Sequence, residues 1–591
     1  MPTKVERWKD EAYGMEIRDH LERFASEGFQ SIPEDERDAW FERFKWWGLY
    51  HQRKGQESYF MLRVGTPMGR MTPEQLRTVG EVAREYATGP VDNPEFGEAY
   101  ADFTTRQSIQ LHWIDIEDVP AVFDELESVG LSTMQACGDS WRNIVGSPVA
   151  GRDADEHVDV WPIVQNLHDR FKGNDLYTNL PRKWKVAVTG DYRGAGQGDI
   201  NDLAFEPAVK EVGDESAEGF NVRVGGGLAR KEPRFARDID VFCRPENVPA
   251  VAAGLSGLFR DYGDREDRFN ARMKFLVDEW GPEKVRSVLQ EEYVDYELPT
   301  AGEDLRDEYD YNAGRADAPG DYVGVYEQRD GQHFVGLSVL VGRMAAEDVI
   351  ELADLADAYG SEMIGLTQRQ NVIVGDIADE DLSAFLEEPL LEEYSPDPHP
   401  FMRGSIACTG TEYCSLSIVE TKNRMVRYAR WLRDNVAVPE GVEDFHIHLS
   451  GCTASCAQPQ IADISLRGMK TRKDGDAVEA FDVGLGGGLG ENPRFADWIE
   501  MRVPADEVPG YIANLLETYE AEREDSESFR SFVAGRDESE LADLADPEET
   551  SYEDPYLANT KMTWYPYAED DAMSASPAPT DSNDEPLATD D

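Results

Sequence analysis

The chain has 591 residues and a net charge of −61, from 58 basic and 119 acidic side chains. This length allows several domains, and so large an excess of carboxylates disfavours nucleic acid and anionic membranes as partners. Because 40% of the residues are apolar and 10% are aromatic, the charge does not indicate general disorder. It is typical of a halophilic protein, whose surface repulsion is screened by concentrated salt.

The sequence also gives expectations about location. The first twenty residues are charged throughout and contain no apolar segment of a secretion signal. No run of about eighteen apolar residues occurs, and six cysteines in so long a chain do not indicate a disulfide framework. We therefore expect a soluble, cytoplasmic protein.

The first predicted elements follow an N-terminal arm, residues 1–58, which is charged but carries several aromatic residues and is expected to dock on the body. Residues 60–64 are predicted to form a strand. A helix is predicted to begin at Pro73, with Thr72 as its N-cap and Gln75 completing a capping box.

The next predicted strand lies in residues 103–113, whose second half alternates between apolar and polar residues. This alternation assigns Ile109, Leu111 and Trp113 to one face. It assigns three polar residues to the other face, namely Arg106, Gln110 and His112. A second helix is predicted from 119 to 129.

The same order of segments recurs about 275 residues later, so the sequence predicts a tandem duplication. Gly342-Arg343-Met344 repeats Gly69-Arg70-Met71, and residues 445–465 repeat residues 184–204. Each copy is predicted to contain a small α+β unit followed by a larger α/β unit. The predicted boundaries are an arm at 1–58, a first copy at 59–132 and 133–310, a second copy at 320–395 and 396–550, and a disordered acidic tail at 565–591.

Four of the six cysteines form two close pairs, with the spacing C-x5-C at Cys408 and Cys414 and C-x3-C at Cys452 and Cys456. Four thiolates brought together in this way suit a four-iron cluster. Zinc is the alternative, although its cysteine pairs usually lie two to four residues apart, and four unrelated thiols are the remaining one. The isolated Cys137 and Cys243 are expected to be inert core thiols.

Basic residues gather in the first copy although the chain is acidic: Arg63, Arg142 and the run Arg182-Lys183-Trp184-Lys185. On a strand, Lys183 and Lys185 would project to one face and Arg182 to the other. Such cations could hold a small oxyanion or the carboxylates of a cofactor. They could equally be surface charges with acidic neighbours.

Two further motifs carry weaker expectations. The glycine runs at 225–227 and 484–490 do not match a dinucleotide-binding pattern, and a tight turn or a close backbone approach is enough to explain them. No nicotinamide or flavin site is found, so electrons are expected from a protein donor. The pair His446 and His448 could bind a metal, but a supporting role is favoured.

Taken together, the cysteine pattern, Thr105-Arg106-Gln107 and Leu180-Pro181-Arg182-Lys183 resemble the sirohaem-dependent nitrite and sulfite reductase family over about residues 55–545. The resemblance implies the fold of that family, with small ferredoxin-like units. It implies a 4Fe-4S cluster held by Cys408, Cys414, Cys452 and Cys456, with Cys456 also the axial ligand of sirohaem. It further implies that Arg63, Arg142, Lys183 and Lys185 face the substrate, and that sirohaem is contacted by Thr104, Arg106, Gln110, His112, Arg182 and Gln370.

The implied reaction is the six-electron reduction of nitrite to ammonia, or of sulfite to sulfide. The stretch 408–414 with Glu420-Thr421-Lys422 resembles assimilatory nitrite reductases, whereas Lys185 stands where sulfite reductases have lysine. The pair Thr453-Ala454 also departs from the family's usual Pro-Asn. We favour nitrite, with reduced ferredoxin as donor to a monomeric enzyme. The alternatives are a sulfite reductase and a non-catalytic iron–sulfur sensor or electron carrier, which would not need the cations.

Overall fold

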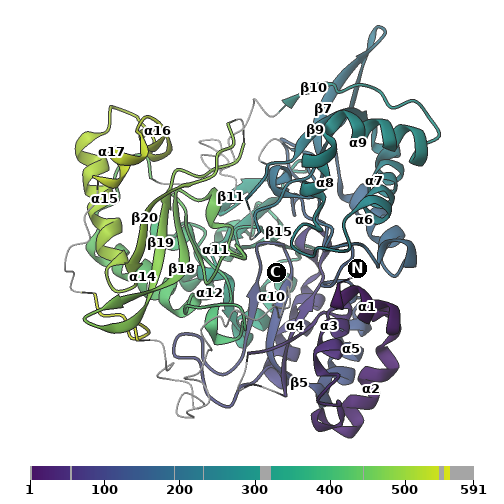
Figure 1. Ribbon diagram of the computed structural model, residues 1–591. Coiled ribbons are helices and arrows are strands. Elements are labelled where there is room, and N and C mark those ends of the chain that lie inside the picture. The colour runs from purple at the N-terminus through teal and green to yellow at the C-terminus, as the bar shows by residue number, and fades with distance from the viewer. Residues whose placement is uncertain are drawn as a thin grey trace.

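The computed structural model describes residues 3–53, 56, 58–191, 194–229, 232–305, 321–442, 445–490, 492–544 and 552–558. The predicted acidic tail at 565–591 lies outside the described residues, as does the whole junction predicted between the two copies, 311–319. Figure 1 shows the larger unit of the first copy and that of the second copy on opposite sides of the molecule, with helices α4 and α10 between them.

The N-terminal arm is helical and packs against the first copy. Its helices are α1 (Lys4–Glu11), α2 (Arg18–Glu27) and α3 (Arg37–Phe44). The indole of Trp46 is fully buried and donates to the carbonyl of Thr178 (2.7 Å), and Trp47 donates to that of Gly14 (3.1 Å). Apolar burial and the hydrogen bond from Trp46 to Thr178 fix the arm to the body, and the bond from Trp47 to Gly14 lies within the arm.

Each small unit is a five-stranded sheet covered by helices, and each takes one edge strand from the other copy. The first sheet has the order β1 (Leu49–His51), β2 (Tyr59–Val64), β5 (Ile109–Asp115), β4 (Tyr100–Phe103) and β13 (Arg343–Ala345). The second has the order β11 (Gly324–Glu327), β12 (His333–Leu337), β15 (Val372–Ile377), β14 (Ile364–Leu366) and β3 (Arg70–Met71). The helices of these units are α4 (Pro73–Tyr86), α5 (Val119–Ser128), α10 (Ala346–Ala358), α11 (Leu382–Leu386) and α12 (Leu390–Glu393).

The exchange of β3 and β13 interlocks the two copies. Both strands follow a tight turn in which one residue, Met68 or Val341, has a positive φ. The turns end at Gly69 and Gly342, where a side chain would collide with a backbone carbonyl of the other copy, at Leu366 and Phe103 respectively. The repeated Gly-Arg-Met sequence therefore marks the crossing between the copies, a role that its spacing alone did not reveal.

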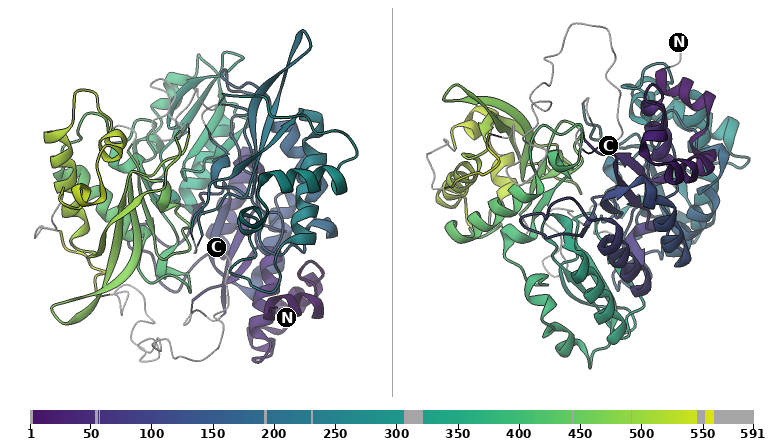
Figure 2. Two further views of the ribbon diagram at one scale, coloured as in Figure 1. Left: turned by 45° about the horizontal axis from the view of Figure 1, so that its top comes forward. Right: turned by 90° about the horizontal axis from the view of Figure 1, so that it is seen from below.

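The two larger units also repeat one topology, in which short parallel strands continue into a long antiparallel hairpin. In the first copy the strands are β6 (Val186–Val188), β7 (Leu203–Val212), β8 (Glu215–Val224), β9 (Arg237–Cys243) and β10 (Glu303–Asp304), with helices α6 (Trp161–Phe171), α7 (Val248–Tyr262), α8 (Met273–Trp280) and α9 (Pro282–Val288). In the second copy they are β16 (Ser405–Ala407), β17 (Ile447–Ser450), β18 (Ile464–Lys473), β19 (Asp476–Leu485) and β20 (Asp497–Pro504), with helices α13 (Pro400–Arg403), α14 (Lys422–Asn435), α15 (Val508–Glu522), α16 (Phe529–Ala534) and α17 (Glu538–Ala542). The predicted α+β class is confirmed, and Figure 2 shows the two long hairpins in their separate units.

Local predictions in the first copy are confirmed in three places and wrong in two, and one of the three is the helix predicted from 119 to 129, which is α5. The strand at 60–64 lies within β2, and α4 begins at Pro73 with the predicted capping box between Thr72 and Gln75. Arg106 does not lie on the strand face, because residues 104–108 form the turn between β4 and β5.

The second error concerns Trp113, which does not share the face of Ile109 and Leu111. A register shift between β2 and β5 and a φ of +65° at Trp113 mark a bulge. The indole therefore packs against Tyr100 and Tyr413, on the side of the second copy, while Ile109 and Leu111 enter the main core. One inserted residue moves the side chains beyond it to the opposite face.

The glycine runs approach the chain's own backbone. A Cβ on Gly226 would lie 2.5 Å from the carbonyl oxygen of Asp199, and one on Gly487 would lie 2.5 Å from that of Gln460.

Among the described residues, no helix combines the length and apolarity that crossing a membrane requires.

Candidate active site

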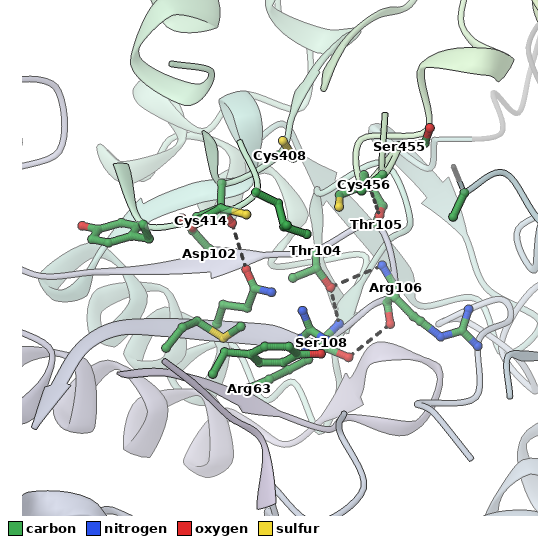
Figure 3. A pocket seen from close by; sticks show the side chains of 18 of the residues that line it. Arg63, Asp102, Thr104, Thr105, Arg106, Ser108, Cys408, Cys414, Ser455 and Cys456 are labelled. Carbon is green, nitrogen blue, oxygen red and sulfur yellow. Dashed lines mark hydrogen bonds between the residues drawn. The ribbon is translucent and has the colours of Figure 1, made fainter. Parts of the chain in front are cut away.

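A cavity of about 520 Å³ lies between the two copies, and its walls differ in chemistry. The second copy contributes sulfur and the first contributes positive charge (Figure 3). The sulfur side consists of Cys408, Cys414, Cys452 and Cys456. The cations of the first copy are Arg63, Arg106, Arg142, Lys185 and Arg272, to which the arm adds Lys45 and the second copy adds Lys422.

The cysteines meet because of the parallel strands of the second copy. Cys408 follows β16 and Cys452 follows β17, and these neighbouring parallel strands end at one edge of the sheet. The backbone N–H of Gly451 donates to the sulfur of Cys408 (3.2 Å), and that of Ala454 to the sulfur of Cys452 (3.4 Å). Such donors stabilise thiolates, the form that binds metal.

The arrangement differs from a site for one metal ion. Within the described ranges, no three His, Cys, Asp or Glu side chains are placed to hold a single ion. In an iron–sulfur cluster each of the four thiolates binds a different iron, so the sulfur atoms are spread around the cluster. The absence of a three-ligand group within the described ranges is therefore compatible with the iron–sulfur hypothesis. His446 and His448 are both buried on β17 and its approach, and neither belongs to such a group.

Two of the predicted substrate-facing residues are arginines held by backbone and side-chain groups. Arg63 on β2 donates to the sulfur of Cys137 (3.3 Å), and its guanidinium lies over the ring of Tyr50 (5.2 Å to the centroid). Arg142 donates to the carbonyl of Gly138 (3.0 Å). Both side chains line the cavity.

The two predicted lysines are placed differently. Lys185 lines the cavity, whereas Lys183 is buried and does not. In the part of the chain that the structure describes, neither ammonium has a carboxylate partner or a hydrogen bond. Burial, followed by Arg106 and Arg272, lowers the pKa of Lys185 to about 7. Burial, followed by the charge of Lys185, lowers the pKa of Lys183 well below its usual value.

Arg106 and Thr104 come from the turn between β4 and β5. Arg106 donates to the side chain of Asn201 (2.8 Å), but its Nε is buried and has no partner among the described residues. Burial, followed by the positive charge of Arg142, lowers the pKa of Arg106 to about 9. The hydroxyl of Thr104 accepts from the backbone N–H of Arg106 (3.3 Å) and of Ser108 (3.1 Å), which fixes the turn.

Gln110, His112 and Gln370 also line the cavity. His112 hydrogen-bonds Asp102 (3.1 Å) and stacks on Tyr413 with ring centroids 3.9 Å apart. The amide of Gln370 donates to the carbonyls of Phe103 (3.0 Å) and Ala407 (3.1 Å). Its side chain therefore holds the turn of one copy against β16 of the other.

Arg182 lies behind the cavity wall and not in it. It donates to Asp139 (3.4 Å), a carboxylate that also receives Arg268 and Lys9 (2.9 Å). Lys9 belongs to the N-terminal arm, and Lys45 of the same arm lines the cavity. The arm is thus part of the site's support, which no sequence motif indicated.

A second charge network was also missed by the sequence analysis. Arg343 on the exchanged strand β13 donates from Nε and Nη2 to Asp102 on β4 (2.6 and 2.9 Å) and from Nη1 to Glu412 (2.8 Å). Glu412 lies between Cys408 and Cys414, so the network ties the cysteine loop to the first copy. The repeated Gly-Arg-Met was the available signal, but only the strand exchange gives Arg343 its partners.

Comparisons with known proteins agree with this geometry. A family model described as the nitrite and sulphite reductase 4Fe-4S domain matches residues 137–297 and 399–547, and one described as the nitrite/sulfite reductase ferredoxin-like half domain matches 51–92, 94–129 and 326–391. An assimilatory ferredoxin-dependent nitrite reductase from Haloferax mediterranei is 53% identical over 99% of this chain and 100% of its own length.

Two further relatives show the breadth of the similarity. A protein named sulfite reductase (ferredoxin) 1 from Mycolicibacterium paratuberculosis is 35% identical over 88% of this chain and 92% of its own length. The structure of the Mycobacterium tuberculosis NirA protein superimposes with a TM-score of 0.81 at 32% identity, and the match covers 92% of this chain and 98% of that one.

Proposed function

The chain belongs to the nitrite and sulphite reductase family, and from this premise we propose that it reduces nitrite to ammonia with six electrons from reduced ferredoxin. The observation that carries the proposal is the two-sided cavity, in which four thiols of one copy face the cations of the other. An electron carrier has no need of such cations, whereas an enzyme that binds a small anion does. We place the reaction in the cytoplasm and expect a monomer.

The family model implies an iron–sulfur cluster, and we assign it to Cys408, Cys414, Cys452 and Cys456. The cavity also fits sirohaem, a cofactor with several carboxylates. The buried Nε of Arg106 has no partner in the described part of the chain, and the Lys185 ammonium has none either. Cys456 would hold sirohaem together with the cluster. When bound, sirohaem supplies the iron at which the oxyanion is reduced, with electrons passed on from the cluster.

The residues of the chain bind the anion and supply protons. Arg63, Arg142 and Lys185 present positive charge to it, which favours binding in a site partly removed from water. A pKa of about 7 lets Lys185 give up and regain a proton near neutral pH. An arriving anion favours the charged ammonium and raises this pKa, so substrate binding loads Lys185 with the proton it donates.

Nitrite is favoured over sulfite by the relative that matches the whole chain, which is named a nitrite reductase. The second candidate is sulfite reduction. It is favoured by the presence of two buried lysines, Lys183 and Lys185, without carboxylate partners.

Steady-state rates with nitrite and with sulfite test the proposal, using reduced methyl viologen as donor in concentrated salt. We expect turnover with nitrite to exceed that with sulfite, and the purified protein to show sirohaem absorption bands. Higher turnover with sulfite would support the second candidate. Absence of turnover with both anions in protein that holds cluster and sirohaem would refute the reductase function.

A further inference from the structure

The two copies differ sharply in charge at one pair of equivalent strands. Strand β18 of the second copy carries four basic residues and no acidic one: Arg467, Lys470, Arg472 and Lys473. The equivalent strand β7 of the first copy carries two acidic residues and one basic one: Glu206, Glu211 and Lys210. The first strand of the duplicated hairpin is therefore basic only in the copy that carries the four cysteines, within a chain of net charge −61.

Strand β18 lies directly against the cysteine loops. A Cβ on Gly468 would lie 2.4 Å from the Val419 side chain and 2.6 Å from the carbonyl oxygen of Gly451, the residue before Cys452. Lys470 and Arg472 follow Gly468 at a spacing of two, so that they project from the same face of the strand. Both are exposed, whereas Gly468 is covered.

The neighbouring strand confirms that this face borders the loop after Cys414. Glu479 of β19 lies opposite Lys470 in the register, and therefore on the same face. Its carboxylate accepts from the backbone N–H of Glu420 (2.9 Å), in the loop that runs from Cys414 to α14. Figure 1 shows β18, β19 and β20 side by side in this unit.

Next to the basic pair, the cysteine loops reach the surface without charge. Ser415 follows Cys414, Thr453 follows Cys452, and both are exposed. Ile418 is also exposed, at 36%. We name this area the cluster-edge surface, which consists of Ser415, Ile418, Thr453, Lys470 and Arg472.

The cations of this surface are available to a partner. In the described ranges, Lys470 forms no ion pair, and Arg472 donates only to the carbonyl of Gly475 (3.1 Å). The arginines on the outer side of α14 are different. Arg430 and Arg427 lie 2.5 and 3.9 Å from Glu95, and Arg433 lies 2.8 Å from Asp434. The unpaired charge therefore lies on β18 and not on α14.

On the basis of the proposed function, we propose that the cluster-edge surface is the docking site for an acidic ferredoxin. Repulsion between two acidic proteins must be reversed locally where electrons enter, and Lys470 and Arg472 do this beside the cysteines. In molar salt, attraction between charges extends only about 3 Å. Docking then depends on ion pairs whose charged groups touch and on burial of Ile418 against the ferredoxin. Because Ile418 lies in the loop after Cys414, this contact places the donor next to the cluster.

The test compares two electron donors in one variant, Lys470→Glu/Arg472→Glu. With a photoreduced, purified acidic ferredoxin, we expect the KM for ferredoxin to rise about tenfold or more, because like charges then face each other. With reduced methyl viologen, which needs no docking, nitrite turnover should stay unchanged. The difference between wild type and variant should shrink as salt is raised.

Two matched controls sharpen the test. Lys210→Glu reverses one charge on the equivalent hairpin of the first copy, and Arg430→Glu reverses one on α14. Each matches one of the two changes on β18, and neither should change the KM for ferredoxin. An unchanged KM in the β18 variant, or a rise in the Arg430→Glu variant alone, would overturn the proposal. If the double variant loses its cluster, the same measurement is made on Lys470→Gln. The KM of this variant for ferredoxin should be about threefold higher than that of the wild type. If the wild type that holds cluster and sirohaem shows no turnover with reduced methyl viologen, the proposed function itself is refuted.

Discussion

Replacement of Arg343 by methionine tests whether the buried network between the copies stabilises the fold. Arg343 is 0% exposed, and its two carboxylate partners, Asp102 and Glu412, are 1% and 0% exposed. The substitution leaves Glu412 buried without its ion-pair partner and, among the described residues, Asp102 with only the cation of Lys422, 3.8 Å away. Loss of Arg343 therefore costs about 3–5 kcal/mol. For a urea slope of about 3 kcal/mol per M, the unfolding midpoint should fall by roughly 1 M.

The matched control is Arg77→Met. Arg77 also crosses between the copies and pairs with two carboxylates, Asp354 and Asp357, but these are 61% and 51% exposed. Exposed pairs contribute about 1 kcal/mol or less, so the midpoint should fall by no more than about 0.3 M. Urea titrations at constant salt, followed by fluorescence and by cluster absorbance, measure both. Equal shifts in the two variants, or no recovery on adding Glu412→Gln to Arg343→Met, would refute the argument from burial.

Three further predictions concern the site. The pKa of Lys185 is about 7 and its charged form binds the anion, so kcat/KM for nitrite should fall as pH rises above about 7. Lys185→Arg should remove this fall, because arginine stays charged. An unchanged pH profile in Lys185→Arg would contradict the prediction. The carboxylate of Asp202 raises the pKa of Lys185, so Asp202→Asn should move the same fall to lower pH, which the same profile measures. Cys456→Ser should lose coupling between cluster and sirohaem in absorption and electron paramagnetic resonance spectra, whereas Cys243→Ser, at a buried thiol remote from the site, should leave both intact; equal spectra for the two variants would count against the assignment.

Parts of the fold were predictable because their signals are local or repeated. The capping box at Thr72 needs only four consecutive residues, and the duplication is visible wherever both copies keep the same segments, as in the Gly-Arg-Met repeat. The two close groups of cysteines, Cys408 with Cys414 and Cys452 with Cys456, are likewise visible from their short spacing along the chain. Each of these features depends on neighbours along the chain.

The errors came from features that depend on register and on burial. Arg106 was assigned to a strand because alternation does not show where a turn interrupts it. Trp113 was assigned to the wrong face because one bulged residue reverses the alternation, and only pairing with β2 reveals the bulge. The function of the N-terminal arm was unreadable, since Lys9 gains its role only by reaching Asp139.

The sequence by itself determined the α+β class, the duplication and the four thiols, because composition, period and spacing are properties of the chain. The tertiary structure alone decided how the copies meet. The exchange of β3 and β13 sets Arg343 between Asp102 and Glu412, and the edge of parallel strands brings the cysteines opposite Lys185. Contacts between residues hundreds of positions apart depend on the packing of whole sheets, and no local pattern in the sequence records them.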